Sequence, residues 1–336
     1  MDAEIARAFS LFFDDAPVAV KTIDTSHGDE DFRTVVIAET RAKSRYVLKL
    51  ADNDFTSPER IAVWQRTVGE YRKLGCWCPR IFADKTGGFP VVDFHGHRCT
   101  AYVEEYARYR PAEDRDDDGK SGAHRTYRRE VWELTARIAA LHLDYAPFPS
   151  AYCLFEKFCP SDGADEVSEN ATEWKEYADT LPSAFREQTD RIWRLWTENR
   201  AALEPVYRTL PTSVFQADLN PTNLLVDDEG RFVGLCDFNL CGREVFLNYL
   251  MRENYGEFEK ELAMIREALQ IASAYYRFSQ SEKDAALPLY RCLKPLSFIS
   301  MEALKEAGSD PEAIRAVLGK TEYYLTAPLD FRSYME

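Results

Sequence analysis

The sequence lacks any uninterrupted apolar run of about eighteen residues, which an α-helix needs to cross a bilayer. It begins Met1-Asp2-Ala3-Glu4, whereas a signal peptide starts with basic residues followed by an apolar stretch. An internal repeat, which would indicate a solenoid or a propeller, is also missing. We therefore expect no membrane partner and a cytoplasmic location.

Cysteine pairs at the spacing of a zinc site are missing too. The chain has eight cysteines, and the closest two flank Trp77 in Cys76-Trp77-Cys78. Two CxxC pairs or a cluster of histidines would suggest bound zinc, and the sequence contains neither. We expect reduced, mostly buried thiols, as is usual for a cytosolic protein.

Positive charge is scarce, because 42 Lys and Arg residues stand against 57 Asp and Glu residues, for a net charge of −15. Binding to a phosphate backbone requires a basic surface, so nucleic acid is not an expected partner. An acidic surface concentrates cationic ligands near the protein, although it also serves solubility alone. Both explanations of the charge remain open from the sequence.

The most informative segment is 216–239. Asp218 lies five residues before Asn223, and Asp237 follows fourteen residues later, after two short apolar runs joined by a turn at 227–230. A kinase-type phosphotransferase needs a carboxylate near the attacking hydroxyl, and an Asn and an Asp that hold Mg²⁺ on the nucleotide phosphates. The spacing predicts that one loop carries Asp218 and Asn223 and that the hairpin returns Asp237 to face them.

This segment resembles the aminoglycoside phosphotransferase and choline-kinase-like family, whose members carry His-Gly-Asp-x4-Asn and then a strand ending in Asp-Trp/Phe-Asp/Glu. The chain departs from that pattern at Gln216-Ala217 and at Asn239. The resemblance implies ATP and Mg²⁺ as cofactors, Asp218 as the catalytic residue, and Asn223 and Asp237 as metal ligands. It implies an α+β, two-lobed protein-kinase-like fold with a small antiparallel-sheet lobe at 1–106 and a large, mainly helical lobe at 107–336.

The N-terminal lobe at 1–106 carries the expected nucleotide-binding groups. A polar turn with Ser26 and Gly28 joins two strands, and such a turn can bring backbone N–H groups close to phosphate. Lys49 lies in an apolar strand, at the position of the family lysine that holds the phosphates. Glu104 and Tyr106 follow the fifth strand, where the resemblance implies that backbone groups contact adenine.

The next helix begins at Ser57-Pro58 and ends before Gly75. In the family this helix supplies a glutamate that fixes the lysine. The 3.6-residue period instead places Glu59 and Glu70 opposite the apolar stripe, with Gln65 nearer the core, so the lysine partner is not identifiable.

The helical part after residue 107 is expected to bind the acceptor. Acidic residues gather in 161–176, among them Asp165, Glu166 and Glu169, and they suggest a small cationic acceptor, although such a run is also common on a solvated face. The sequence therefore favours a small-molecule kinase. The alternative is a pseudokinase-like nucleotide- or protein-binding module, which Gln216 and Asn239 would favour. The oligomeric state is open.

Overall fold

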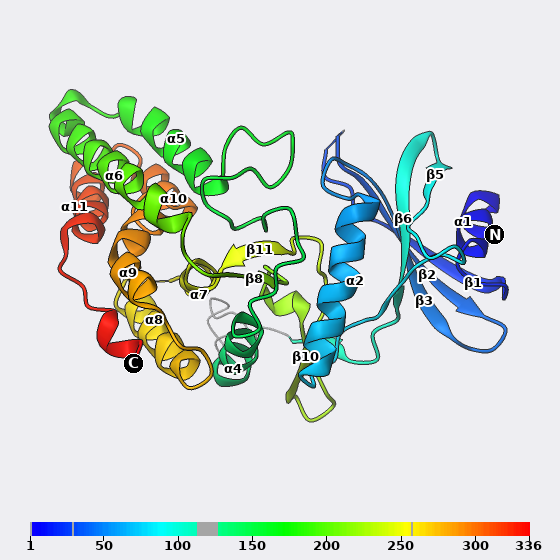
Figure 1. Cartoon of the computed structure of the whole chain (residues 1–336). Coiled ribbons are helices and arrows are strands. Elements are labelled where there is room, and N and C mark those ends of the chain that lie inside the picture. The colour runs from blue at the N-terminus through cyan, green and yellow to red at the C-terminus, as the bar shows by residue number, and fades with distance from the viewer. Residues whose placement is uncertain (1, 29, 113–126, 257) are drawn as a thin grey trace.

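The computed structural model describes residues 2–28, 30–112, 127–256 and 258–336, and it divides into a sheet-rich and a helix-rich part (Figure 1). In the described chain, the N-terminal sheet has the order β1-β2-β3-β6-β4, with β5 also paired to β6, and every pair is antiparallel. The strands are β1 (Pro17–Asp24), β2 (Phe32–Thr40), β3 (Arg45–Asp52), β4 (Ile81–Phe82), β5 (Val91–Phe94) and β6 (His97–Glu105).

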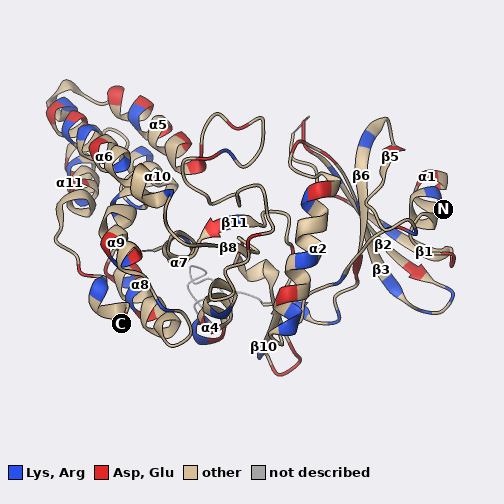
Figure 2. Ribbon diagram, viewed as in Figure 1, with Lys and Arg blue, Asp and Glu red and all other residues tan. Residues whose placement is uncertain are grey.

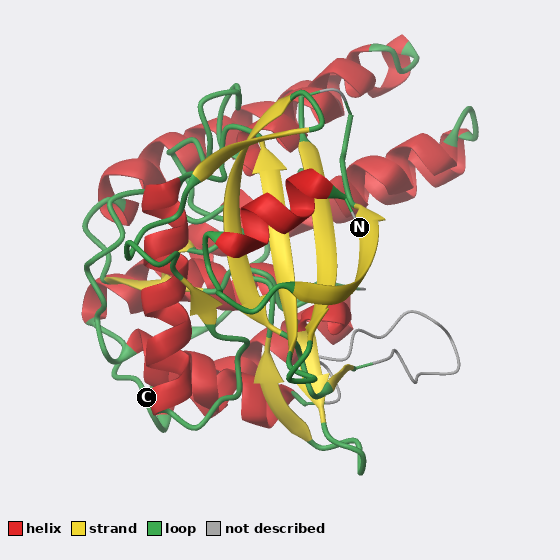
Figure 3. Ribbon diagram, turned by 90° about the vertical axis from the view of Figure 1, so that its right-hand side faces the viewer, coloured by secondary structure: helices red, strands yellow, loops and turns green. Residues whose placement is uncertain are grey.

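Helix α1 (Ala3–Ser10) lies across the outer face of this sheet (Figure 3). Its Ile5 and Phe9 join a core cluster with Val36 of β2 and Leu48 of β3. Because successive strand residues point to opposite faces, burying Leu48 on the outer face turns Lys49 to the inner face. The alternation of side chains along β3 thus places Lys49 on the side of the sheet that faces the rest of the molecule.

Helix α2 (Pro58–Lys73) packs on the inner side and belongs to the larger core cluster, which extends into the C-terminal part. Ser57 caps it as expected, accepting from the N–H of Arg60 at 3.3 Å, and Pro58 occupies the first turn. The ring of Tyr71 on α2 meets Phe238 at 5.5 Å. The helix therefore touches the segment that follows β10.

A backbone clip joins the loop after α2 to strand β10 (Phe232–Leu235). The N–H of Trp77 donates to the carbonyl of Val233 at 2.9 Å, and its carbonyl accepts from Leu235 at 3.0 Å. Gly234 makes this approach possible, because a Cβ there would lie 1.8 Å from the Trp77 carbonyl oxygen. The loop and the strand therefore hold each other through main-chain bonds.

The C-terminal part is mainly helical, and its described residues also form two small antiparallel sheets. One sheet has the order β10-β9-β7, and the other pairs β11 with β8. Its remaining strands and short turns are β7 (Arg110–Pro111), β8 (Thr212–Phe215), β9 (Leu224–Val226), β11 (Gly242–Val245), η1 (Ser183–Phe185), η2 (Pro221–Asn223) and η3 (Arg332–Tyr334). Its helices are α4 (Arg128–Ala139), α5 (Glu166–Asp179), α6 (Arg186–Tyr207), α7 (Phe246–Glu253), α8 (Phe258–Ser273), α9 (Gln280–Leu293), α10 (Phe298–Ala307) and α11 (Pro311–Thr326).

These elements agree with the expected α+β class, with a sheet-rich N-terminal region and a helical C-terminal region. All eight cysteines are free, and all but the partly exposed Cys236 are buried, as expected. Within the described ranges, the helices include none that is both long enough and apolar enough to span a membrane.

Candidate active site

The loop after β8 carries Asp218 and Asn223 on one side, as the sequence predicted. The amide nitrogen of Asn223 donates to Oδ2 of Asp218 at 2.7 Å, and the N–H of Asn220 donates to Oδ1 at 3.2 Å. Burial raises the pKa of Asp218, and the nearby charge of Asp237 raises it further, while the hydrogen bonds from Asn220 and Asn223 oppose these effects. Asp218 is therefore a fixed, partly buried carboxylate whose proton affinity is increased.

Gln216 occupies the position of the family histidine, and its side chain is fully buried. Its carbonyl oxygen accepts from the N–H of Asp218 at 2.8 Å, and its amide nitrogen donates to the carbonyls of Cys236 and Asp237 at 3.0 and 2.7 Å. One glutamine therefore braces both loops of the site. Between them, Ala217 stands where the family has glycine and takes a φ of 64°, a left-handed conformation that favours glycine.

Asp237 follows β10 and also has a left-handed backbone, with a φ of 54°. The N–H of Cys236 donates to the carbonyl of Asn223 at 2.9 Å, which brings the residue before Asp237 against the loop that carries Asp218 and Asn223. The Asp237 side chain is 37% exposed, and its Oδ1 lies 3.4 Å from Nζ of Lys49. Asp218, Asn223, Asp237 and Lys49 thus come together.

Lys49 has a second anionic partner that the sequence did not indicate. Its Nζ lies 3.2 Å from Oε2 of Glu104, and both side chains are largely buried, at 21% and 12% exposure. Burial lowers the pKa of Lys49, but Asp237 and Glu104 outweigh it, so the net pKa is well above the ordinary value. Burial raises the pKa of Glu104, with Lys49 opposing that shift.

The expected role of Glu104 needs correction. Adenine was expected to contact its backbone, but that backbone lies inside the sheet, where Glu104 pairs with Val47 of β3 and Ile81 of β4. Its side chain is the part that faces the site. Tyr106 lies beyond the end of β6, and its ring lies 4.0 Å from the guanidinium of Arg45.

Helix α2 does not direct a carboxylate at Lys49, in line with the pattern in its sequence. Glu70 pairs with Lys73 at 2.9 Å, and the amide of Gln65 donates to the carbonyl of Ile81 at 2.9 Å. The helix instead brings Trp64 against Tyr102, the residue opposite Lys49 on β6, with the ring centroids 5.9 Å apart.

The hairpin between β1 and β2 uses the polar groups of Ser26 internally. Its N–H donates to Asp24 at 2.9 Å, and its hydroxyl accepts from the N–H of Arg33 at 3.0 Å. Gly28 is exposed, with a φ of 73° and open space where a Cβ would lie. Ser26 and Gly28 were both expected to contact the nucleotide. The polar groups of Ser26 are already hydrogen-bonded within the hairpin, whereas Gly28 is exposed at the turn.

A cavity of about 270 Å³ lies beside Lys49 and Asp237. Its lining includes Arg33 and Asn239, neither of which the sequence assigned to the site in a binding role. The buried Nε of Arg33 and the buried Oδ1 of Asn239 have no hydrogen-bond partner among the described residues. The sequence did not indicate that Arg33 belongs to the site, because the position of Arg33 beside Lys49 depends on the pairing of β2 with β3.

On the helical side, the end of α7 touches the loop that carries Asp218. Oε1 of the buried Glu253 accepts from the N–H of Leu219 at 3.1 Å. Burial raises the pKa of Glu253 to about 8, with the charge of Asp218 adding to the shift and the Leu219 hydrogen bond opposing it. A titratable carboxylate thus holds the backbone beside Asp218, which the sequence pattern did not reveal.

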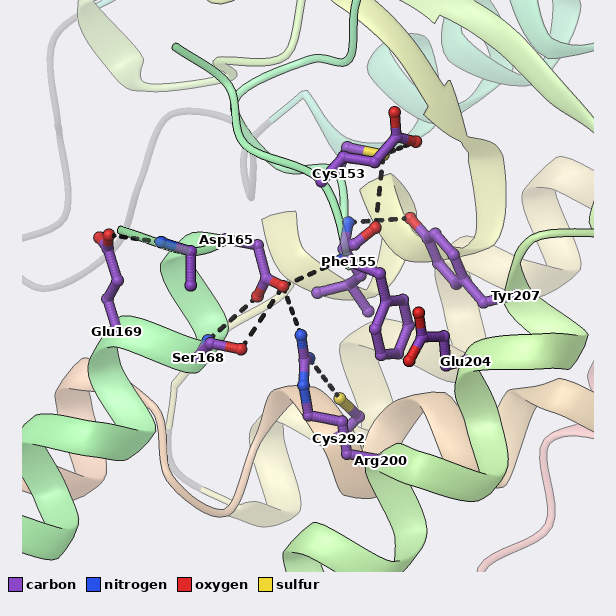
Figure 4. Close-up of polar contacts among 12 residues, drawn as sticks. Cys153, Phe155, Asp165, Ser168, Glu169, Arg200, Glu204, Tyr207 and Cys292 are labelled. Carbon is purple, nitrogen blue, oxygen red and sulfur yellow. Dashed lines mark hydrogen bonds and ion pairs between the residues drawn. The ribbon is translucent and has the colours of Figure 1, made fainter. Parts of the chain in front are cut away.

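Several acidic residues of the segment 161–176, which was expected to contact the acceptor, have partners within the protein. Asp165 is buried, caps α5 by accepting from the N–H of Ser168, and pairs with Arg200 (Figure 4). Glu169 accepts from Gly163 and Ala164 of the preceding loop at 3.0 and 3.2 Å.

Other acids of this segment are paired as well, since Glu166 contacts Arg252, and Glu173 lies 3.1 Å from Lys305. Basic and acidic residues are interspersed along α5, α6 and α11 (Figure 2). The buried Asp165 is therefore withdrawn from the acceptor site, whereas acceptor binding by the exposed Glu166 and Glu169 stays a prediction.

The residues of the loops fit a magnesium ion in donor chemistry. Mg²⁺ prefers oxygen ligands and is typically held by one or two carboxylates together with phosphate oxygens. Asp237 offers a partly exposed carboxylate. Because the side-chain amide nitrogen of Asn223 faces Asp218, the side-chain carbonyl oxygen of Asn223 is left to ligate a metal ion. Lys49 supplies a cation for phosphate beside them.

Comparisons with known proteins agree with this geometry. The sequence model of a family described as "Phosphotransferase enzyme family" matches residues 23–246. Among solved structures, the macrolide 2'-phosphotransferase MphH from Brachybacterium faecium is similar, at 16% identity over 98% of this chain and 100% of that chain, with a TM-score of 0.50. A search of curated proteins found no match.

Two further solved structures are similar. The microcompartment-associated aminopropanol kinase has 14% identity over 96% of this chain and 95% of that chain, with a TM-score of 0.53. Amicoumacin kinase hAmiN, solved with AMP-PNP, Ca²⁺ and Ami, has 14% identity over 99% of this chain and 97% of that chain, with a TM-score of 0.50. At such identities the likeness shows a shared fold, and it confirms the kinase-like architecture expected from the sequence.

Proposed function

This chain belongs to the phosphotransferase enzyme family, and on that premise we propose that it moves the γ-phosphoryl group of ATP to a hydroxyl of a small molecule. The observation that carries the proposal is the hydrogen bond of 2.7 Å between Asn223 and Asp218, in a loop bonded to the segment that carries Asp237. The proposal assigns nucleotide binding to residues 1–106 and acceptor binding to residues 107–336.

Asp218 is the residue that accepts the proton of the acceptor hydroxyl. Its raised pKa makes it a better base than an exposed aspartate, and Asn223 fixes its orientation through Oδ2. Lys49 neutralises phosphate charge, because the carboxylates of Glu104 and Asp237 keep its buried ammonium protonated.

Asn223 and Asp237 would hold Mg²⁺, which offsets the negative charge of the nucleotide phosphates when bound. Gly28, at the open hairpin turn, is the proposed contact of the nucleotide phosphates through its backbone. Tyr106, after β6, is the proposed contact of the adenine base. Arg33 is added to this set because it lines the same cavity as Lys49. Ser26 contributes by shaping the hairpin that presents Gly28.

A cationic acceptor remains part of the proposal on different grounds from the acidic segment. The net charge is −15, and an acidic protein concentrates cationic ligands near its surface. The solved relatives named above are kinases or phosphotransferases of macrolides, aminopropanol and amicoumacin, and those compounds guide the choice of a test panel.

The test is a screen for ATP consumption with Mg²⁺ against small alcohols, amino alcohols, aminoglycosides and macrolides. Transfer to at least one acceptor, lost in Asp218→Ala, is the expected result. The alternative, a module that binds nucleotide without transfer, predicts a rise in melting temperature with MgATP but no turnover with any acceptor. Absence of both binding and turnover would reject both readings.

A further inference from the structure

The partner of Lys49 lies on a different element from the one the family resemblance implies. Lys49 on β3 lies directly opposite Tyr102 on β6, so these two side chains share one face of the sheet. Glu104 is two residues further along β6, which returns its side chain to that same face. Lys49 and Glu104 are therefore diagonal neighbours on this face, and two long side chains can span that distance. Accordingly, Nζ of Lys49 lies 3.2 Å from Oε2 of Glu104.

The space between Lys49 and helix α2 is filled by aromatic rings. Trp64 of α2 packs edge-on against Tyr102, and Nζ of Lys49 lies 5.8 Å from the Tyr102 ring. A carboxylate reaching from the helix would have to displace these rings. The sheet, and not the helix, therefore supplies the charge that fixes the lysine.

Resting on the proposed function, we propose that Glu104 is the positioning residue of Lys49 and that it keeps Asp237 available for the metal. Lys49 lies between the two carboxylates, at 3.2 Å from Glu104 and 3.4 Å from Asp237. Without Glu104, the buried ammonium has Asp237 as its remaining anionic partner in the part of the chain that the structure describes, and it competes with Mg²⁺ for that carboxylate.

Because Lys49 and Glu104 belong to the same sheet, their relative positions do not depend on helix α2. Strands β3 and β6 are hydrogen-bonded neighbours over most of their length, so Lys49 and Glu104 keep their alignment when α2 moves. The phosphate-binding lysine is thus aligned by the fold of the sheet itself. The charge on the pair is largely shielded from solvent, which strengthens the attraction between its members.

The experiment compares Glu104→Gln with Glu105→Gln. Glu105 is the next residue on β6, is partly exposed, and lies 3.5 Å from Arg72 and not near Lys49. Binding of a non-hydrolysable ATP analogue with Mg²⁺ is measured by calorimetry, and the Mg²⁺ concentration for half-maximal activity is measured separately. Glu104→Gln should weaken analogue binding about ten- to a hundredfold, in line with the loss of a charged hydrogen bond.

Glu104→Gln should also raise the half-saturating Mg²⁺ concentration, while Glu105→Gln leaves both values near wild type. Glu104→Asp, which keeps the charge on a shorter side chain, should fall between wild type and Glu104→Gln. Wild-type binding in Glu104→Gln would overturn the inference. If wild-type protein itself binds no analogue, the proposed function fails instead.

A second comparison covers the case in which Glu104→Gln does not fold. Removing both partners leaves no unpaired buried charge, so the double variant Lys49→Met/Glu104→Gln is expected to fold. If Glu104 acts through Lys49, this double variant binds the analogue as weakly as Lys49→Met alone. A further loss of about tenfold, which corresponds to about 1.4 kcal/mol, would show that Glu104 acts in another way.

Discussion

The side-chain amide of Gln216 donates a hydrogen bond of 2.7 Å to the backbone carbonyl of Asp237. The same side chain accepts from the N–H of Asp218 at 2.8 Å, so one residue sets the catalytic loop against the segment that would hold the metal. The histidine of the family pattern is thus replaced by a residue that bonds to both loops. Glutamine suits this position because its amide offers both donors and an acceptor.

Gln216→Ala should therefore be strongly destabilising. The truncation leaves buried backbone groups without partners, and each such group costs about 1–3 kcal/mol. We expect a loss of at least about 2 kcal/mol in urea unfolding, together with a large fall in activity. Gln280→Ala, on the surface at the start of α9, is the control and should change stability by less than about 0.5 kcal/mol. Equal stability of the two variants would contradict the bracing role.

Asp218→Ala should remove transfer while leaving nucleotide binding intact. A positioned general base is worth about 10²–10⁴ in rate, and the carboxylate is not expected to ligate the metal in this proposal. The measurement is kcat with the acceptor found in the screen, beside the melting-temperature shift given by MgATP. Asp228→Ala, in the exposed turn between β9 and β10, is the matched control. Retention of more than about a tenth of wild-type turnover would exclude Asp218 from the role, on the same scale.

Glu253 should make the protein less stable as the pH rises. Its pKa is about 8 in the folded protein against 4.5 for the free group, so the folded state holds a proton that the unfolded state has lost between these values. The folded state therefore binds more protons in this window, and the free energy of unfolding falls from about pH 4.5 to about pH 8.

In Glu253→Gln this contribution disappears, while the amide oxygen can still accept from Leu219. The variant should lose less stability than wild type between pH 5.5 and 8, by the order of a few kcal/mol. Denaturant unfolding at both pH values gives the comparison. Parallel pH profiles of the two proteins would mean that Glu253 remains ionised in the folded state.

Asp165→Asn should affect the fold and not the acceptor. Asparagine is as good a helix cap as aspartate, so the cap of α5 is kept and the charge facing Arg200 is lost. Breaking a buried pair by removing one partner typically costs about 3–5 kcal/mol. We expect a fall in stability on that scale with the KM for the acceptor unchanged. A raised acceptor KM at unchanged stability would return Asp165 to the acceptor site.

The central part of the site could be predicted from the sequence because its residues are close together in the chain. Asp218, Asn223 and Asp237 lie within two loops and a hairpin, whose geometry is set by local turns. The structure brings them together as expected. Lys49 was identified from the family resemblance, as the lysine of an apolar strand that lies just before the next helix.

The role of Glu104 could not be predicted, because it depends on how two distant strands align. Whether Glu104 faces Lys49 is fixed by the pairing of Lys49 with Tyr102, and a register shift of one residue would turn it to the other face. The same reason applies to Arg33, whose place near Lys49 follows from the β2–β3 register. The structural role of Asp165 was not predictable either, because its partner Arg200 lies 35 residues away in the sequence.

The backbone clip between Trp77 and strand β10 limits how the two halves of the molecule can move. Its two main-chain hydrogen bonds, to Val233 and Leu235, lie only a few residues before Asp237. We therefore expect any opening and closing over a substrate to occur as rotation about this point, with Asp237 close to the axis. Such a hinge would admit and release nucleotide while the metal-holding segment keeps its place.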